Sequence, residues 1–448
     1  MSYQIKKILL SVVVALLFFA AAYSFVGLTK AALLGSIALF VGLWSSEALP
    51  LGVVSLLPII LFPSFGILST KATTVNYANH IIFLFLGGFL LAIGVEKTKL
   101  HLYIAQKILD IFPKTPRGMI FSLALTSGLL SSVLSNTTTT LLLISIAIFL
   151  TEHTGLKMRF ALAIAYGANI GGILTPIGTP PNLVLLGIMS DSNMEMIPFF
   201  TWMMLTAPLV LFMLFFMAFL LSIGTKEIPI ERIKEKLTLS QEQKKVLYLL
   251  FGLVALLLVN AKIKPYWSGL GLSESGILLA FGLALFMPPL NVLKWEDDFH
   301  KVPYAIIFLF GAGFSIAKAF SHTGLADDIA NVLLGMTDMT PVLLLLATAT
   351  LITFATEITS NTALISIMLP VIYSVAKQSG IDETLFMMVA TLCASYAFML
   401  PIATPPNAIA MSSGAVHIKD MLKYGIVLNI VGILAITAIA FFYWRYFI

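Results

Sequence analysis

A short polar triplet occurs twice in this chain, each time inside a long apolar run, and this duplication constrains the fold more than any other feature. Residues 135–137 and 360–362 both read Ser-Asn-Thr, 225 positions apart. The heptapeptide Pro-Ile-Gly-Thr-Pro-Pro-Asn at 176–182 returns at 401–407 with the same separation and one change, Gly to Ala. The chain is therefore an internal duplication whose polar, helix-breaking motifs occupy matching positions in both copies.

The composition places the chain in a membrane. Of its 448 residues 59% are hydrophobic and only 10% are charged, with a mean hydropathy of +1.01. In a soluble domain roughly a quarter of the residues are charged. This chain has too few charged residues to cover a surface that faces water. A spanning helix needs about 20 apolar residues, and runs of that length recur throughout. We predict an all-α polytopic protein of the cell (inner or plasma) membrane, embedded in lipid and without a nucleic-acid partner.

We expect about eleven transmembrane helices. The apolar stretch after Lys6 and Lys7 runs about 21 residues, which exceeds the 7–15 of a signal peptide, so we expect it to stay as the first membrane helix. The expected spans lie near 8–28, 31–44, 48–64, 78–95, 160–189, 196–222, 245–261, 270–289, 303–320, 384–412 and 421–444.

The two segments that hold the triplets, 117–151 and 340–376, each consist of two apolar arms joined at Ser-Asn-Thr. They are either pairs of full crossings or re-entrant hairpins that enter and leave on one side. Irregular backbone at membrane depth is tolerated where protein or a water-filled cavity covers it. We favour re-entrant hairpins with the triplets at their tips.

Lys and Arg set the predicted orientation, because cytoplasmic loops carry the excess of both. With the N-terminus inside, 19 of the 26 Lys and Arg fall inside and 7 outside. The expected divisions are an N-terminal membrane helix (1–30), a first repeat (31–224), a cytoplasmic connector (225–244) and a second repeat (245–448).

The number of crossings between the copies predicts their relative orientation. Ile-Ile-Phe-Leu-Phe at 81–85 recurs at 306–310, and the chain crosses five times between them, or seven if the first hairpin spans. Either number is odd, so the second copy points the opposite way. Many secondary transporters are such inverted-topology repeats, with substrate and ion sites at broken helices near the midplane.

The triplets have the chemistry of an ion site. Ser, Asn and Thr favour helix N-caps, so each triplet can begin the second arm of its hairpin. That directs unpaired N–H groups and a positive dipole end at the centre, where an anion would bind. The carbonyl, hydroxyl and amide oxygens of the tips suit a hard cation such as Na⁺. The predicted substrate-binding residues here are Ser135, Asn136, Thr137, Ser360, Asn361 and Thr362.

The Thr-Pro-Pro-Asn motifs supply a second wall. Proline removes an N–H and breaks the helix, and the freed carbonyls need a partner, of which a bound cation is one. Thr179 and Thr404 can donate to an anion, while Gly178 and Ala403 are small enough for close approach.

Glu357 is the most notable charge inside an apolar run. An intramembrane carboxylate marks function by default. It lies four residues before Asn361, and its counterpart in the first copy is Ser132. It is either a proton or cation site or a hydrogen-bonded structural residue, and we favour the structural role.

Paired Ser-Asn-Thr tips with paired Thr-Pro-Pro-Asn breaks resemble the divalent anion/sodium symporter family, over nearly the whole chain. The resemblance implies eleven membrane helices, two re-entrant hairpins, a homodimer and elevator movement. It also implies Na⁺ as the coupling ion, at one site formed by Ser131, Ser135, Asn136 and Gly178 and a second formed by Thr356, Ser360, Asn361 and Ala403. Ser131 and Thr356 keep the separation of 225.

We therefore expect a secondary transporter that imports C4 dicarboxylates such as succinate, fumarate and malate with Na⁺. Two tips can hold two carboxylates, and no Lys or Arg lies within the motifs to balance a trianion. A sodium-independent dicarboxylate exchanger and a sulfate or citrate carrier are the alternatives. We expect no enzyme, because all nine Asp lie in loops or at span ends and hydrolase motifs are missing from the sequence. The duplication favours alternating access over a channel.

Overall fold

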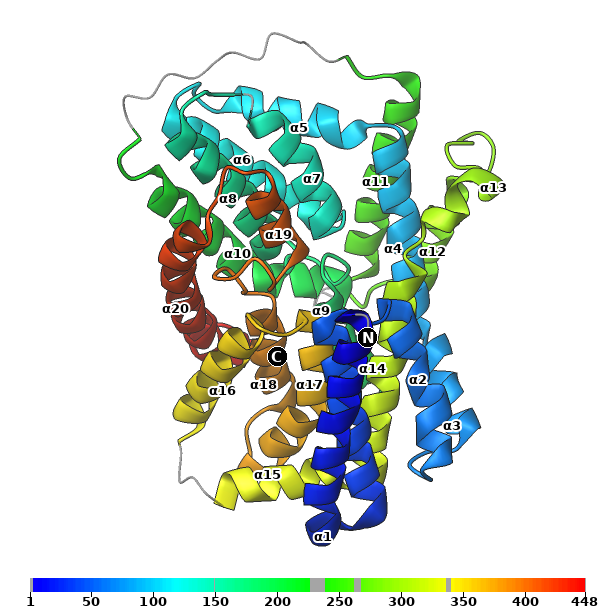
Figure 1. Cartoon of the computed structure of the whole chain (residues 1–448). Coiled ribbons are helices and arrows are strands. Elements are labelled where there is room, and N and C mark those ends of the chain that lie inside the picture. The colour runs from blue at the N-terminus through cyan, green and yellow to red at the C-terminus, as the bar shows by residue number, and fades with distance from the viewer. Residues whose placement is uncertain (1–2, 149, 226–237, 262–266, 336–339, 448) are drawn as a thin grey trace.

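The computed structural model describes residues 3–148, 150–225, 238–261, 267–335 and 340–447. These residues are almost entirely helical, in elements α1 to α20 with three short 3₁₀ turns (Figure 1). Within the described ranges, six helices are long and apolar enough to cross a membrane. The all-helical membrane class is therefore confirmed. Most of the predicted connector, 226–237, lies outside the described residues, and its last residues already belong to α11 (Gln241–Asn260).

The first two predicted spans form one bent element, α1 (Tyr3–Ser46). Its backbone leaves the helix at Gly27 (φ 78°, ψ 175°), a conformation that suits glycine. The two arms return along each other so closely that a Cβ on Gly42 would lie 2.9 Å from the Ser11 hydroxyl. The elements α2 (Leu51–Ser64), α3 (Thr70–Thr74) and η1 (Val75–Ala78) follow.

The same sequence of elements then occurs twice. The first set is α4 (His80–Lys97), α5 (Leu100–Ile111), α6 (Pro116–Ser131), α7 (Asn136–Ala147), α8 (Thr154–Gly171), α9 (Pro180–Asp191) and α10 (Phe199–Ser222). The second is α14 (Tyr304–Thr323), α15 (Leu325–Gly335), α16 (Pro341–Ala355), α17 (Asn361–Ser379), α18 (Glu383–Ala394), α19 (Pro405–Ser412) and α20 (Ile418–Phe442). The starts of α5, α6, α7 and α9 lie 225 residues before those of α15, α16, α17 and α19, which is the separation of the motifs.

Two helices were missed by the sequence analysis. Neither α5 nor α15 falls within an expected span, so no helix was predicted at either place. Both are amphipathic, with an apolar side buried in the protein. Figure 1 places them at opposite ends of the molecule.

Two expected spans are each divided into a pair of helices. The span 160–189 consists of α8 and α9, and the span 384–412 consists of α18 and α19. Pro stands at the first helical positions of α9 and α19, where its missing N–H costs nothing. The predicted helix breaks at the Thr-Pro-Pro-Asn motifs are therefore confirmed.

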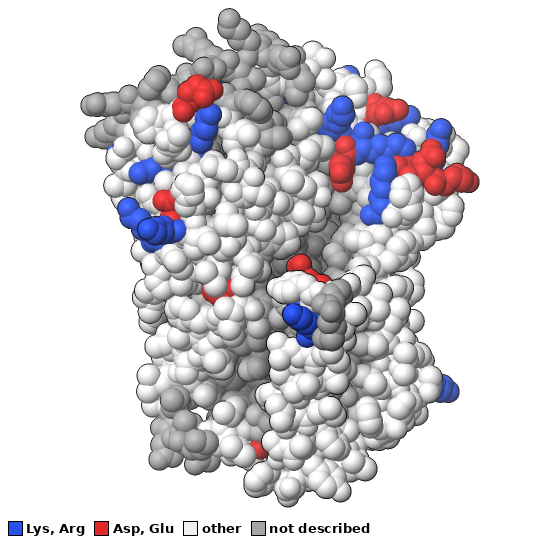
Figure 2. Space-filling view, viewed as in Figure 1, with Lys and Arg blue, Asp and Glu red and all other residues white. Residues whose placement is uncertain are grey.

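The remaining helices, α11, α12 (Glu274–Ala284) and α13 (Trp295–Asp298), stand beside α4. A Cβ on Gly87 of α4 would lie 2.4 Å from the Leu278 backbone of α12, so only glycine allows this contact. At the C-terminal end of α4, the Asp298 carboxylate accepts from Lys97 at 2.5 Å and from Lys301 at 2.7 Å. On the face in Figure 2, Lys and Arg gather mainly at this end of the molecule, which is the predicted inner side.

Candidate functional site

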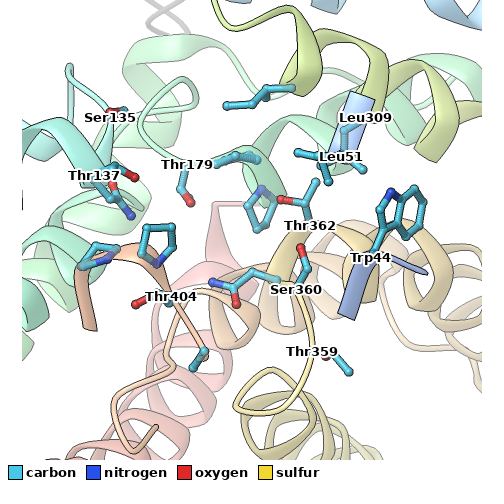
Figure 3. Close-up of a pocket in the computed structure, with 18 of the residues that line it drawn as sticks. Trp44, Leu51, Ser135, Thr137, Thr179, Leu309, Thr359, Ser360, Thr362 and Thr404 are labelled. Carbon is cyan, nitrogen blue, oxygen red and sulfur yellow. The ribbon is translucent and has the colours of Figure 1, made fainter. Parts of the chain in front are cut away.

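All four sequence motifs line one cavity of about 770 Å³. Figure 3 shows Ser135 and Thr137 on one side, Ser360 and Thr362 on the other, and Thr179 and Thr404 between them. The volume is within the range of small-molecule sites. The predicted residues on its wall are Ser135, Asn136, Thr137, Gly178, Thr179, Ser360, Asn361, Thr362, Ala403 and Thr404.

Four helices begin at this cavity. The helices α7 and α17 start at Asn136 and Asn361, and α9 and α19 start directly after Thr179 and Thr404. The N-terminus of a helix carries a partial positive charge and free N–H groups, so four of them together favour an anion. Each of α9 and α19 begins with two Pro residues, which have no N–H. The direct backbone donors therefore come from α7 and α17.

The two tips differ in how their helices are capped. At the first tip the Ser135 hydroxyl accepts from the Thr138 N–H at 3.1 Å and so uses one of the free donors of α7. At the second tip Ser360 is the N-cap of α17, but its side chain makes no capping bond. The start of α17 therefore keeps one more backbone donor for a ligand than the start of α7.

Each tip has the same internal hydrogen bond. Ser131 donates to Asn136 Oδ1 at 2.5 Å, and Thr356 donates to Asn361 Oδ1 at 2.6 Å. Ser131 and Thr356 are fully buried behind the tips and do not line the cavity, unlike the other predicted residues. In both copies a hydroxyl oxygen and an amide oxygen thus lie side by side, which is the ligand chemistry that a hard cation prefers.

The breaks are held by the last residue of each Thr-Pro-Pro-Asn motif. The Asn182 amide donates to the carbonyls of Gly172 (3.3 Å) and Thr175 (2.9 Å). At the matching positions Asn407 donates to Ala397 (2.9 Å) and Leu400 (3.0 Å). The motif's own Asn amide is thus a partner for these four freed carbonyls, which need no cation to satisfy them.

Asn169 joins the two copies. Its amide donates to Thr404 Oγ1 at 3.1 Å and to Asn407 Oδ1 at 3.3 Å, so a residue of α8 fixes the start of α19. Its own Oδ1 is buried without a hydrogen-bond partner. The available sequence signal was an Asn in the last turn of the apolar helix α8.

Glu357 stabilises the second break. Its carboxylate is 3% exposed and accepts from the backbone N–H groups of residues 398–400 at 2.8–3.1 Å and from Asn429 Nδ2 at 2.7 Å. Three backbone donors and one amide give it the hydrogen bonds that a buried carboxylate needs. This geometry favours the structural role over a proton site. The counterpart of Glu357 in the first copy is Ser132. Its backbone carbonyl contacts the first break by accepting a hydrogen bond from Thr175 Oγ1 at 2.5 Å.

The cavity wall carries one charged residue among those described. This is Glu47, an exposed residue with a left-handed backbone (φ 50°). No group of three His, Cys, Asp or Glu that could hold a metal was found in the described ranges. At the two tips themselves, the side-chain oxygens that a cation could meet are neutral.

The far wall was not predicted from the sequence. Trp44, Leu51 and Leu309 lie across the cavity from the first tip (Figure 3), and Gln4 also lines it. Gln4, Trp44 and Leu51 lie outside the repeated motifs, and Leu309 belongs to the repeated block at 306–310, to which no site role was assigned from the sequence.

The fold and the cavity define the class of the protein. Broken helices whose ends converge on a central polar cavity, inside an apolar helical chain, are the construction of a secondary transporter. The chain matches the family described as citrate transporter (CitMHS) over residues 41–391. It belongs to this family, and the predicted divalent anion/sodium symporter membership is confirmed. The protein is thus an integral plasma membrane transport protein and not an enzyme.

Two relatives are similar over most of their length. The sodium-dependent dicarboxylate transporter SdcS of Staphylococcus saprophyticus is 30% identical over 432 residues, covering 89% of this chain and 83% of SdcS. SdcS of Staphylococcus aureus has the same identity and coverage.

Two solved structures share the fold. The YdaH transporter of Alcanivorax borkumensis superposes with a TM-score of 0.60 at 15% identity, covering 82% of this chain and 86% of YdaH. MtrF of Neisseria gonorrhoeae, whose structure was described with a class of antimetabolite efflux pumps, gives 0.58 at 13% identity and covers 83% of both chains. At such identities the likeness concerns the fold alone.

Proposed function

We propose that this protein imports C4 dicarboxylates together with Na⁺ by an elevator-type alternating-access mechanism. The observation that carries the proposal is the single cavity at which four helices begin, two of them with free backbone donors. The name of the relatives, sodium-dependent dicarboxylate transporter, supports the substrate class and the ion.

Charge balance explains why sodium would be required. Helix ends supply only partial charges, and the described cavity wall carries no Lys, Arg or His. Co-bound Na⁺ ions would offset the charge of a dianion. The adjacent oxygens of Ser131 with Asn136, and of Thr356 with Asn361, give one cation position behind each tip.

The spacing of the tips would select the substrate. One carboxylate would bind at Asn136 and Thr137 and the other at Asn361 and Thr362, with the Thr404 hydroxyl between them. Sulfate could use only one tip, and citrate would bring a third charge without a cationic partner. Competition against labelled succinate tests this assignment: fumarate and malate should compete well, citrate less and sulfate poorly. Sulfate competing as well as malate would refute the two-tip site.

The repeated elements support alternating access. We infer an inverted-topology repeat, since α5 and α15 lie at opposite ends of the molecule and begin 225 residues apart (Figure 1). In this arrangement the pairs α6–α7 and α16–α17 are re-entrant hairpins that enter from opposite sides. We also propose a homodimer, in which the fixed parts of two copies would support the moving parts.

The two tip asparagines provide the direct test. Asn136→Ala and Asn361→Ala should each abolish succinate uptake while the protein still reaches the membrane. Asn331→Ala is the matched control, because Asn331 is exposed on α15 and does not line the cavity. Normal uptake by either tip variant would refute the site.

A sodium-independent exchanger is the alternative for the same cavity. Vesicles loaded with unlabelled succinate distinguish the two mechanisms. Counterflow that persists after Na⁺ is removed from both sides would select the exchanger, while its loss would support symport.

A further inference from the structure

A second cavity, of about 170 Å³, lies away from the proposed substrate site. It is formed by α9, α14, α15 and α17, and four charged side chains surround it: Asp191, Lys318, Asp327 and Lys377. All four are exposed. In the described structure no two of them are close enough to form an ion pair.

Two of these helices begin at the substrate cavity. The helix α9 begins after Thr179 and ends at Asp191, and α17 begins at Asn361 and carries Lys377 in its last turn. Each therefore has the substrate site at its N-terminus and the second cavity at its C-terminal end. A shift of either helix would move both cavities together.

The other two helices are tied to the N-terminal elements. On α15, Asp328 accepts from Lys30 of α1 at 2.5 Å. On α14, Ser315 donates to the Thr73 carbonyl at 3.2 Å and accepts from Asn76 Nδ2 at 3.3 Å. The second cavity is thus lined both by helices that carry the motifs and by helices that α1, α3 and η1 hold in place.

The charges are complementary across this boundary. Asp191 of α9 and Lys377 of α17 lie on the helices that begin at the substrate cavity, while Lys318 of α14 and Asp327 of α15 lie on the helices tied to the N-terminal elements. Each side contributes one acid and one base, so a single closing movement would pair both. The Asp191 carboxylate already accepts from Asn79 Nδ2 at 3.2 Å, and Asn79 directly follows η1, so the end of α9 and η1 lie close together here.

We propose that these four residues form an electrostatic latch that is open in this structure and closes when α9 and α17 move against α14 and α15 during transport. The latch rests on the proposed alternating access. Closure would fill the second cavity with two ion pairs, Asp191–Lys318 and Lys377–Asp327, and would stabilise one end state of the carrier. The latch would therefore affect the rate of turnover and not the affinity of the substrate site.

Charge reversal tests the latch. Asp191→Lys, which opposes two Lys, should lower the maximal rate of sodium-dependent succinate uptake about two- to five-fold, as expected for an exposed ion pair. Equilibrium binding of succinate should be unchanged. The exchanged pair Asp191→Lys with Lys318→Asp should recover the rate. Lys71→Glu is the control, because Lys71 is an exposed residue of α3 outside the second cavity.

An uptake rate in Asp191→Lys equal to that of the wild type would overturn the proposal. So would an exchanged pair no faster than that single variant. A single variant that fails to fold is recognised by its loss of succinate binding, and recovery in the exchanged pair then still reports the pairing.

A cross-linking measurement separates failure of the latch from failure of the proposed transport. In membranes, a short bifunctional thiol reagent should join Asp191→Cys to Lys318→Cys, whether or not succinate is the substrate. The native Cys393 is buried and should not react. The pair Asp191→Cys with Lys71→Cys should stay unlinked. Absence of the 191–318 product would refute the latch even if the wild type transports succinate.

Discussion

Replacing Glu357 by Gln distinguishes a structural carboxylate from a proton site. Its two oxygens accept four donors: the N–H groups of Phe398, Met399 and Leu400, and the Asn429 amide. Gln has nearly the same shape but only one acceptor oxygen. Its NH₂ group would therefore face the Leu400 N–H, a donor against a donor.

The magnitude follows from these contacts. A hydrogen bond to a charged group contributes about 1.5–3 kcal/mol, and a buried donor left without a partner costs about 1–3 kcal/mol. The Gln variant weakens the bonds to the remaining oxygen and leaves one backbone donor unpaired. We expect it to be destabilised by about 2–4 kcal/mol, whereas Glu357→Leu, which leaves all four donors unpaired, should not accumulate in the membrane.

Thermal unfolding in detergent, measured beside the pH dependence of uptake, is the assay. Glu357→Gln should lower the unfolding temperature, and the protein that remains folded should keep the pH profile of the wild type. Glu195→Gln, at an exposed residue of the loop after α9, is the control and should change neither. A Gln variant as stable as the wild type but with an altered pH profile would refute the structural role and identify a proton site.

Three further predictions concern the tips, the breaks and the inner surface. Gly178→Ala should lower uptake strongly, because its Cβ would lie 2.4 Å from a backbone carbonyl, whereas Ala403→Gly should be tolerated; equal losses would contradict the close approach. Ser135→Ala should cost about 1 kcal/mol of stability through the lost cap, and Ser360→Ala almost nothing, as melting in detergent would report. Burial acts to raise the pKa of Asp298, but hydrogen bonds from two Lys side chains and a backbone N–H lower it to about 2. The stability that this carboxylate provides is complete above pH 4 and is lost as the pH falls toward 2. Asp298→Asn should flatten the unfolding profile in that window.

Much of the fold followed from the apolar runs and the duplication. Run length separated spans from loops, and the separation of 225 residues between the motifs reappears in four pairs of helix starts. The bend of α1 at Gly27 falls at the end of the first expected span, 8–28. The helices α5 and α15 were missed because an amphipathic helix at a membrane surface needs an apolar side rather than an apolar run.

The site was predicted where its chemistry is local in sequence. The Ser-Asn-Thr and Thr-Pro-Pro-Asn motifs carry their own caps and breaks, so their positions identified the cavity wall. Partners that the fold alone brings together could not be inferred. The backbone donors of Glu357 lie more than 40 residues away, and Asn169 meets Thr404 across the two copies. Trp44, on the opposite wall, comes from α1, which lies outside the repeated elements.

Uptake of labelled succinate by vesicles that contain the purified protein, with and without a sodium gradient, tests the central proposal most directly. The cavity wall has no cationic side chain among its described residues, so a dianion would need Na⁺ beside it. We predict that uptake requires Na⁺ and stops when choline or potassium replaces it at the same pH. Equal uptake in all three media would contradict sodium coupling.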